Sequence, residues 1–263
     1  MNRTETKGRL QLLDGQSLAW TRNGPERRSG TPTLLWLGGF RSDMNGGKAM
    51  ALATAADARG WPCLRFDYFA HGGSTGDWEA ASIGRWREDA LSVIDSLTEG
   101  PLVLVGSSMG GWIACLAALA RPERVKALAL IAPAADFTEA LMRPALGNAV
   151  LAEIERDGKW MQPSEFGGEY AITRRLLDEG RNWLILNGPV AIDRPVRILQ
   201  GGEDPDVPWE HALKLAHAIK SRDVVFHLIK DGDHRLSRPQ DLTRLVACVA
   251  ELVGDDGAGQ AQR

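Results

Sequence analysis

The feature that most constrains the fold is a regular alternation of short, wholly apolar runs with longer amphipathic stretches. A strand inside a parallel sheet is covered on both faces and therefore reads as a continuous apolar run, whereas a helix that covers the sheet shows apolar residues at the helical period. We assign strands to residues 34–37, 63–66, 102–105, 125–131, 196–199 and 224–229. We assign helices to residues 47–59, 82–97, 109–121, 209–220 and 239–253.

The beginning of the chain has a different pattern. Two apolar runs, residues 10–13 and 18–20, flank Asp14-Gly15, a dipeptide that favours the tight turn of an antiparallel hairpin. The fold class that follows is α/β, with a mostly parallel central sheet, helices on both faces and an antiparallel N-terminal hairpin. With 263 residues, of which 44% are hydrophobic, the chain can form one such domain around a sizeable core.

One interval departs from the alternation. Connections in α/β units typically add ~2–6 residues to a helix, yet residues 134–190 separate two predicted strands and are rich in aromatic and aliphatic side chains. We predict a helical lid insertion at residues 134–190 over the carboxyl ends of the parallel strands, an α/β core at 1–133 and 191–253, and a flexible tail at 254–263. A structural subdomain that does not touch substrate is the alternative for the insertion.

Charge and cysteine usage exclude several functions. Lys and Arg number 31 against 34 Asp and Glu, and this net charge of −3 argues against a protein that binds nucleic acid or an anionic membrane surface. Cys63, Cys115 and Cys248 lie far apart, which is neither a disulfide framework nor a zinc site. No stretch approaches the ~18 consecutive apolar residues of a membrane span, and the first residues lack the apolar region of a signal peptide. We expect a cytoplasmic protein without metal, cofactor or membrane insertion.

A candidate nucleophile follows the run at residues 102–105. That run leads directly into Gly106-Ser107-Ser108-Met109-Gly110, which matches G-x-S-x-G, and a predicted helix comes next. Between a strand and a helix this motif is typical of a nucleophile elbow, a strained turn that holds the serine Oγ out of the sheet. The outer glycines leave room for the turn, and the helix directs its N-terminal amides toward the reacting centre. We predict Ser108 as the nucleophile and Ser107 as a structural residue.

A serine hydroxyl needs a base to accept its proton and an acid to orient that base. On a fold of this kind the three residues follow the chain order Ser, then Asp or Glu, then His, each near the carboxyl end of a strand. Asp204 follows one predicted strand and His234 follows the next. We therefore predict Asp204 as the acid and His234 as the base, with Glu203 and Asp206 as alternatives for the acid.

The other histidines fit the role of base less well. His211 and His217 fall within a predicted helix and His227 within a predicted strand, which is typical of structural or solvated side chains. His71 is the one serious alternative, because its glycine-rich turn also lies at the carboxyl edge of the sheet. It precedes Ser108 in the chain, however, which is the wrong order for this fold.

Acyl transfer also needs fixed hydrogen-bond donors for the oxyanion. One donor should be the backbone N–H of Met109, the residue after the nucleophile. The loop after residues 34–37 begins Gly38-Gly39-Phe40-Arg41, and its glycines let the backbone approach the site. We predict the N–H of Phe40 as the second donor. Arg41 comes next and should lie near the leaving group, where its guanidinium suits a carboxylate, unless it is a loop residue paired with Asp43.

Several short stretches of the chain are similar to those of one known superfamily. They are Gly39-Phe40-Arg41-Ser42-Asp43-Met44, Arg65-Phe66-Asp67-Tyr68, Val105-Gly106-Ser107-Ser108-Met109-Gly110-Gly111-Trp112, Ala120-Arg121-Pro122-Glu123, Ala134-Ala135-Asp136, Val207-Pro208-Trp209 and Asp233-His234-Arg235. From residue 10 to about residue 253 the chain resembles the α/β-hydrolase superfamily. Within it the resemblance is strongest to the mitochondrial palmitoyl-protein thioesterases, also known as mycophenolic acid acyl-glucuronide esterases, and their bacterial relatives. Ala70 is a departure, since relatives usually have a glycine before His71.

The resemblance implies a triad of Ser108, Asp204 and His234, in agreement with the assignment from chain order. It also implies hydrolysis of acyl thioesters or activated acyl esters, either small molecules or groups attached to protein, and it offers the mitochondrial matrix as an alternative location. We take Trp112 and Trp209, together with the arginine that follows Phe40, as candidate substrate contacts.

The same fold hosts other functions. A serine at the elbow excludes dehalogenase and epoxide-hydrolase chemistry, which needs a carboxylate there. A cofactor-free haloperoxidase or acyltransferase keeps the same triad, and a hydrolase-like receptor binds a ligand in the same pocket without turnover. A fluorophosphonate probe discriminates the receptor, because a pure binding protein should label slowly or not at all.

Overall fold

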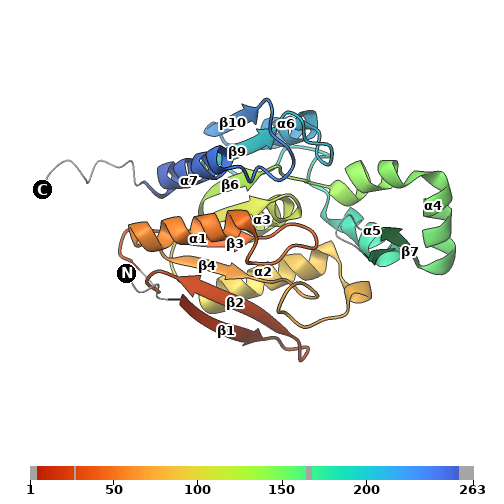
Figure 1. Ribbon diagram of the computed structural model, residues 1–263, viewed down its shortest axis with the longest axis horizontal. Coiled ribbons are helices and arrows are strands. Elements are labelled where there is room, and N and C mark those ends of the chain that lie inside the picture. The colour runs from red at the N-terminus through yellow and green to blue at the C-terminus, as the bar shows by residue number, and fades with distance from the viewer. Residues whose placement is uncertain (1–4, 27, 164–167, 255–263) are drawn as a thin grey trace, which may run out of the picture.

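The computed structural model describes residues 5–26, 28–163 and 168–254, so the predicted tail lies outside it except for Gly254 (Figure 1). An eight-stranded sheet forms the centre of the molecule. Its strands lie in the spatial order β1 (Glu5–Gln11), β2 (Ser17–Asn23), β4 (Cys63–Phe66), β3 (Thr33–Leu37), β5 (Leu102–Ser107), β6 (Val125–Ile131), β9 (Val196–Gly201) and β10 (Val224–Ile229).

The pairing of these strands confirms the predicted fold class. β1 pairs antiparallel with β2, and β2 pairs antiparallel with β4, whereas the remaining neighbours in this sheet are parallel. The antiparallel pair is joined by the turn that contains Asp14-Gly15, as the sequence predicts. A mostly parallel sheet places the loops that carry function at one edge, where its strands end.

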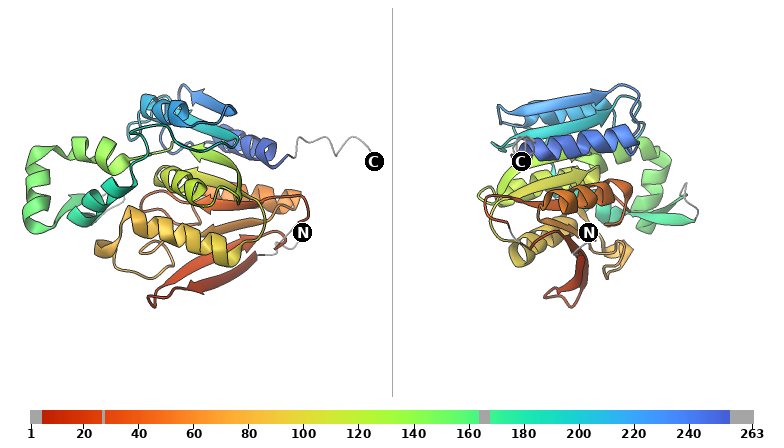
Figure 2. Two further views of the ribbon diagram at one scale, coloured as in Figure 1. Left: turned by 180° about the vertical axis from the view of Figure 1, so that it is seen from behind. Right: turned by 60° about the vertical axis from the view of Figure 1, so that its left-hand side comes forward.

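Helices cover both faces of the sheet. α1 (Gly47–Arg59) and α7 (Pro239–Val253) lie on one face, and α2 (Ile83–Leu97), α3 (Met109–Ala120) and α6 (Trp209–Ala218) lie on the other (Figures 1 and 2). The residues of β5 alternate between the two cores: Leu102 and Leu104 face the α2 and α3 side, and Val103 and Val105 face α1 and α7. All four are fully buried, which explains why the strand reads as one continuous apolar run.

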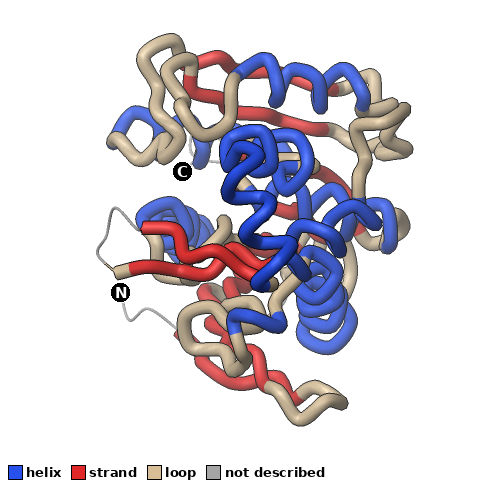
Figure 3. The backbone as a smooth tube through the Cα atoms, turned by 90° about the vertical axis from the view of Figure 1, so that its right-hand side faces the viewer, coloured by secondary structure: helices blue, strands red, loops and turns tan. Residues whose placement is uncertain are grey.

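Residues 134–190, which we call the connecting segment, run from β6 to β9 and add no strand to the main sheet. The segment projects from the molecule on the side opposite the termini (Figures 1 and 3). It is largely helical, but it also forms an antiparallel strand pair that the sequence analysis did not predict. Its elements are the π-helix η2 (Thr138–Met142), α4 (Arg143–Asp157), β7 (Lys159–Pro163), β8 (Glu169–Thr173), α5 (Arg174–Gly180) and the 3₁₀-helix η3 (Arg181–Trp183).

Hydrogen bonds hold the connecting segment to the core. The carboxylate of Asp136 accepts the N–H of Ile185 at 2.9 Å and that of Leu186 at 2.8 Å, and so joins the two ends of the segment. The indole N–H of Trp78, in the short 3₁₀-helix η1 (Trp78–Ala80), donates to the carbonyl of Ala171 in β8 at 2.7 Å. These bonds fix the segment beside the carboxyl ends of the strands. In the part of the chain described, no helix has the length and apolar composition that crossing a bilayer requires.

Candidate active site

The candidate active site lies where parallel strands end. Ser108 follows β5, Asp204 follows β9 and His234 follows β10. Phe40 follows β3, and His71 follows β4. Because parallel strands present their carboxyl ends at one edge of a sheet, residues far apart in the sequence converge there.

Ser108 occupies a strained turn between β5 and α3. Its backbone has φ 55° and ψ −120°, a conformation that costs a non-glycine residue on the order of 1–3 kcal/mol. A Cβ on Gly106 would collide with the carbonyl of Gly110, and a Cβ on Gly110 would collide with the backbone of Leu37. The N–H of Ser108 donates to the carbonyl of Ile131 at 2.8 Å. The two glycines of the motif are therefore required by close backbone approach.

Ser108, His234 and Asp204 form one hydrogen-bonded chain. Nε2 of His234 lies 3.1 Å from Oγ of Ser108, and Nδ1 lies 2.8 Å from Oδ2 of Asp204. A carboxylate can only accept, so Nδ1 carries the ring proton and Nε2 directs its lone pair at the serine hydroxyl. The structure thus brings together the three residues that the sequence analysis selected from separate loops.

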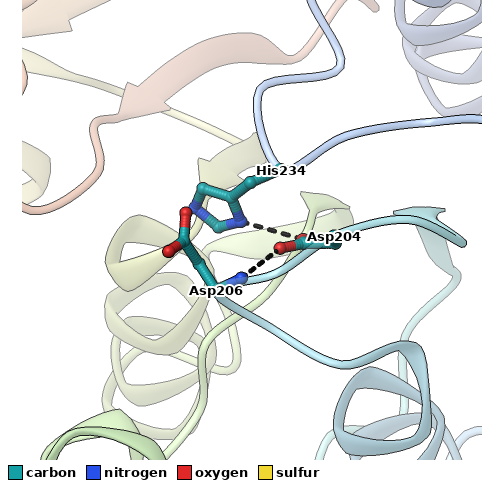
Figure 4. Close-up of side chains that lie close together, drawn as sticks. All are labelled: Asp204, Asp206 and His234. Atoms are coloured by element: carbon teal, nitrogen blue, oxygen red, sulfur yellow. Dashed lines mark hydrogen bonds and ion pairs between the residues drawn. The ribbon is translucent and has the colours of Figure 1, made fainter. Parts of the chain in front are cut away.

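The surroundings of Asp204 keep it ionised. Its side chain is fully buried. Oδ1 accepts the N–H of Asp206 at 2.9 Å (Figure 4) and that of Val207 at 2.8 Å. Burial alone would raise the pKa of Asp204. The hydrogen bond from His234, the positive charge of this ring when it is protonated and the two backbone N–H groups outweigh burial and lower the pKa of Asp204.

The two alternative acids lie in different surroundings. Asp206 and Glu203 are both exposed. The carboxylate of Asp206 nevertheless lies close to the imidazole of His234, since ligand atoms of Asp204, Asp206 and His234 lie within 4.8 Å of one another (Figure 4). Among the residues described, these three groups are the ones close enough together to hold a metal ion. Of the three acids, it is Asp204 that bonds to Nδ1.

The loop after β3, residues 38–44, passes beside the elbow, and we call it the oxyanion loop. A Cβ added to Gly39 would lie 3.4 Å from both the Cβ of Ser108 and the carbonyl oxygen of Ser107, so the two backbones are in contact. Among the residues described, neither the N–H of Phe40 nor that of Met109 donates to a protein acceptor. Both amides are therefore available to a ligand at the serine.

Side chains from the next loop hold the backbone of the oxyanion loop. The N–H of Arg41 donates to Nε2 of His71 at 3.1 Å, and the N–H of Met44 donates to Oδ1 of Asp67 at 2.7 Å. Arg41 has a positive φ of 57°, which side chains other than glycine rarely adopt. Ala70, which precedes His71, likewise has a positive φ of 60°. The sequence analysis placed His71 at this edge of the sheet but did not predict its contact with the loop.

The ring of Phe40 packs in an aromatic cluster built by the core and the connecting segment. Its centroid lies 5.2 Å from that of Trp78 and 5.9 Å from that of Trp86. Phe137 and Tyr170, from the connecting segment, lie at 5.7 and 6.1 Å. An apolar wall therefore stands directly beside the predicted oxyanion donor.

Arg41 faces the connecting segment. Its guanidinium carbon lies 3.9 Å from the centroid of the Tyr170 ring, and both residues line a cavity of about 540 Å³. Among the described residues that line this cavity, four are acidic, and Arg41 supplies a positive charge. The acidic residues are Asp43, Asp77, Glu79 and Glu169.

The two predicted tryptophan contacts lie in different places. Trp112 is fully buried, and its indole N–H donates to the carbonyl of Trp183 at 3.2 Å. Its ring also packs edge-on against that of Phe137 at 5.8 Å between centroids, so Trp112 joins α3 to the connecting segment. Trp209 begins α6 and is 36% exposed.

Comparisons with known proteins agree with this geometry. Residues 30–245 match the profile of the family described as "Alpha/beta hydrolase family". The human mitochondrial palmitoyl-protein thioesterase ABHD10 is 38% identical over 225 residues, which cover 85% of this chain and 73% of that protein. The structure of ABHD10 from mouse superposes with a TM-score of 0.85 at 36% identity, covering 95% of this chain and 98% of the other. A protein from Agrobacterium vitis S4 superposes with a TM-score of 0.89 at 40% identity, covering 96% and 100%.

Proposed function

This chain belongs to the α/β-hydrolase family, and we propose that it is a serine hydrolase that cleaves carboxylic thioesters or esters through an acyl-enzyme intermediate. The observation that carries the proposal is the hydrogen-bonded chain from Asp204 through His234 to Ser108, set beside two unengaged backbone amides. Every group that acyl transfer requires is present within these loops. The chemistry calls for no cofactor or metal.

The first half-reaction forms the acyl-enzyme. Oγ of Ser108 attacks the carbonyl carbon while Nε2 of His234 takes the hydroxyl proton, and the carbonyl electrons move onto oxygen. Asp204 holds the imidazole in place and stabilises its positive charge. His234 then returns the proton to the departing thiolate or alkoxide as the bond to the leaving group breaks. Water repeats the sequence with His234 as base and releases the carboxylic acid.

The oxyanion formed in both halves is stabilised by the backbone N–H groups of Phe40 and Met109. Met109 is the first residue of α3, so the helix dipole adds to its effect. Loss of one such donor typically reduces kcat by about 10²- to 10³-fold. The spacing between Gly39 and the elbow supports Phe40 as the residue that completes the pair.

We propose an apolar acyl group as the preferred substrate, as in palmitoyl thioesters, attached to protein or to a small molecule. The similarity to a palmitoyl-protein thioesterase supports this preference. The aromatic cluster around Phe40 offers apolar surface, and the connecting segment would act as a lid over the chain. Each methylene of the acyl chain that is buried contributes about 0.8 kcal/mol to binding, so substrates with longer acyl chains should react at lower substrate concentration.

The test is a substrate panel that compares p-nitrophenyl esters of rising chain length, an S-palmitoyl peptide and an acyl glucuronide, with Ser108→Ala as the inactive control. We expect kcat/KM to rise with chain length and the S-palmitoyl peptide to be cleaved with release of one thiol per acid. Activity confined to short esters would overturn the acyl preference. Ligand binding without any turnover by the folded protein would favour a receptor, and halogenation dependent on peroxide would favour a haloperoxidase.

We also propose a cytoplasmic location. Cys63, Cys115 and Cys248 are free and buried, and burial raises the pKa of the Cys63 and Cys115 thiols to about 12. Unpaired, unreactive cysteines are typical of a reducing compartment. Fractionation of cells that produce the chain checks this, and recovery with mitochondria, the location named for the similar ABHD10 proteins, would contradict it.

A further inference from the structure

His71 is a buried histidine that the proposed chemistry does not use. It is 4% exposed, and aromatic rings surround it: Tyr68 at 5.8 Å, Trp78 at 5.5 Å and Trp86 at 5.2 Å between centroids. A buried polar ring costs free energy unless both of its nitrogens have partners. The identity of those partners shows what the ring does.

Both nitrogens of His71 bond to backbone, and the partners fix the position of its proton. The N–H of Arg41 can only donate, so Nε2, 3.1 Å away, must accept with its lone pair. The carbonyl of Phe69 can only accept, so Nδ1, 3.1 Å away, must carry the proton. His71 is therefore a neutral ring protonated at Nδ1 and fully hydrogen-bonded.

The bond to Arg41 acts on the residue that precedes it. The N–H of Arg41 and the carbonyl of Phe40 belong to one planar peptide unit, so holding this N–H sets the ψ angle of Phe40. Arg41 itself stays at a φ of 57°, a strained conformation that needs support from its surroundings. The other side-chain acceptor of the oxyanion loop, Asp67, bonds at Met44, three residues further along.

We propose that His71 is a positioning residue for the oxyanion hole: its Nε2 holds the Arg41 N–H and thereby aims the Phe40 N–H at the developing oxyanion beside Ser108. The inference rests on the proposed function. The role requires a neutral ring, because only an unprotonated Nε2 can accept the Arg41 N–H. Burial and then the Arg41 guanidinium lower the pKa of His71 and so keep Nε2 unprotonated.

Two substitutions of His71 distinguish the effect of its hydrogen-bond acceptor from the effect of its aromatic ring. His71→Phe keeps an aromatic ring of similar shape among Tyr68, Trp78 and Trp86 but removes the acceptor. His71→Gln removes the ring but offers an amide oxygen near the position of Nε2. A mis-aimed donor should cost less than a deleted one, which typically costs 10²–10³ in kcat. We expect His71→Phe to lower kcat for p-nitrophenyl butyrate by about 10- to 100-fold with KM within about threefold, and His71→Gln to recover kcat to within about fivefold of the parent.

A matched control uses a half-buried histidine that also bonds to a backbone carbonyl. Nε2 of His211 lies 2.7 Å from the carbonyl oxygen of Ala135, a bond that involves no residue of the oxyanion loop, so His211→Phe and His211→Gln should leave kcat within about twofold. Urea unfolding of each variant identifies any loss of fold. A folded His71→Phe with parental kcat, or a folded His71→Gln as slow as His71→Phe, would overturn the inference.

A second measurement does not depend on turnover. Nitrogen-15 NMR of histidine-labelled parent protein should show His71 as a neutral ring protonated at Nδ1, with Nε2 unprotonated at neutral pH. A proton on Nε2 would overturn the inference even if the enzyme is active. A correct tautomer in a protein that hydrolyses no ester or thioester would instead count against the proposed function.

Discussion

His234 and His71 lie at the candidate site on separate loops. Both rings are protonated at Nδ1, but their nitrogens bond to different kinds of group. Nδ1 of His234 bonds to the Asp204 carboxylate, whereas Nδ1 of His71 bonds to a backbone carbonyl. Nε2 of His234 faces the hydroxyl of Ser108, and Nε2 of His71 faces the amide of Arg41. The two rings share a tautomer and differ in the groups that their nitrogens contact.

The groups that bond to each imidazole determine whether it can act as a base. A carboxylate stabilises the imidazolium that forms when His234 takes a proton. Nδ1 of His71 bonds to a neutral carbonyl instead, and burial followed by the Arg41 charge lowers the pKa of His71. A serine hydroxyl can also give up its proton, whereas an amide N–H does not. His234 is therefore suited to act as a base, and His71 to act as a fixed acceptor.

Removal of the Ser108 hydroxyl, which His234 deprotonates, should have the largest effect on kcat. Ser108→Ala is expected to lower kcat by about 10⁴- to 10⁶-fold, because the three residues act as a unit. The urea midpoint should stay close to that of the parent, since the change removes one oxygen. Steady-state hydrolysis of p-nitrophenyl butyrate measures the effect, and activity within about tenfold of the parent would rule out this nucleophile.

The carboxylate partner of His234 comes next. Asp204→Asn replaces an acceptor with an amide that can donate to Nδ1 and so favours the wrong tautomer, with an expected loss of about 10⁴ in kcat. Asp206→Asn is the matched control, and because its carboxylate is exposed the loss should stay below about tenfold. The opposite ranking of the two variants would move the role of acid to Asp206.

Much of the fold could be predicted because each element carries a local signal. The predicted helices 47–59 and 239–253 have the observed bounds, since Gly60 and Gly254 end them in the left-handed conformation. The pair β7 and β8 was missed because alternation over five residues does not distinguish a short strand from a turn of helix.

The candidate site was predictable to the extent that its residues follow a motif or a chain order. Ser108, Asp204 and His234 could be selected in this way, and their catalytic roles remain predictions. The contact of His71 with Arg41 joins a side chain to a backbone N–H, which every residue except proline has, so no residue type marks it. It depends on the path of two loops that the sequence pattern does not specify.

The neutral state of His71 can be tested through the pH dependence of the free energy of unfolding. The unfolded chain has the usual histidine pKa of about 6.5, and the folded pKa of His71 lies below it. Between these two values the unfolded state binds more protons, so the contribution of His71 to the free energy of unfolding is complete above about pH 6.5 and is lost as pH falls through the folded pKa.

Urea unfolding at about pH 7.5 and about pH 5.5 should show a smaller difference in the free energy of unfolding for His71→Gln than for the parent. His211, whose pKa burial also lowers, should supply part of the remaining difference. An unchanged difference in His71→Gln would show that His71 does not titrate as described.

The smallest expected effect concerns the Arg41 side chain, as distinct from its backbone. If the guanidinium over Tyr170 meets a carboxylate on the leaving group, Arg41→Ala should lower kcat/KM for an acyl glucuronide by about two- to fivefold, the size of an exposed ion pair. A p-nitrophenyl ester with the same acyl chain should change by less than about twofold. Equal losses on both substrates would assign the side chain to support of the oxyanion loop.

The proposed function depends most on Ser108 as an activated nucleophile, and covalent labelling tests this role directly. The native protein is treated with a fluorophosphonate, and the adduct is located by peptide mass spectrometry while esterase activity is followed. We expect one phosphonyl group per chain on Ser108, in step with loss of activity, and no adduct in Ser108→Ala or in the heat-unfolded protein. An adduct on another residue, or full activity in a protein whose Ser108 is labelled, would contradict the account.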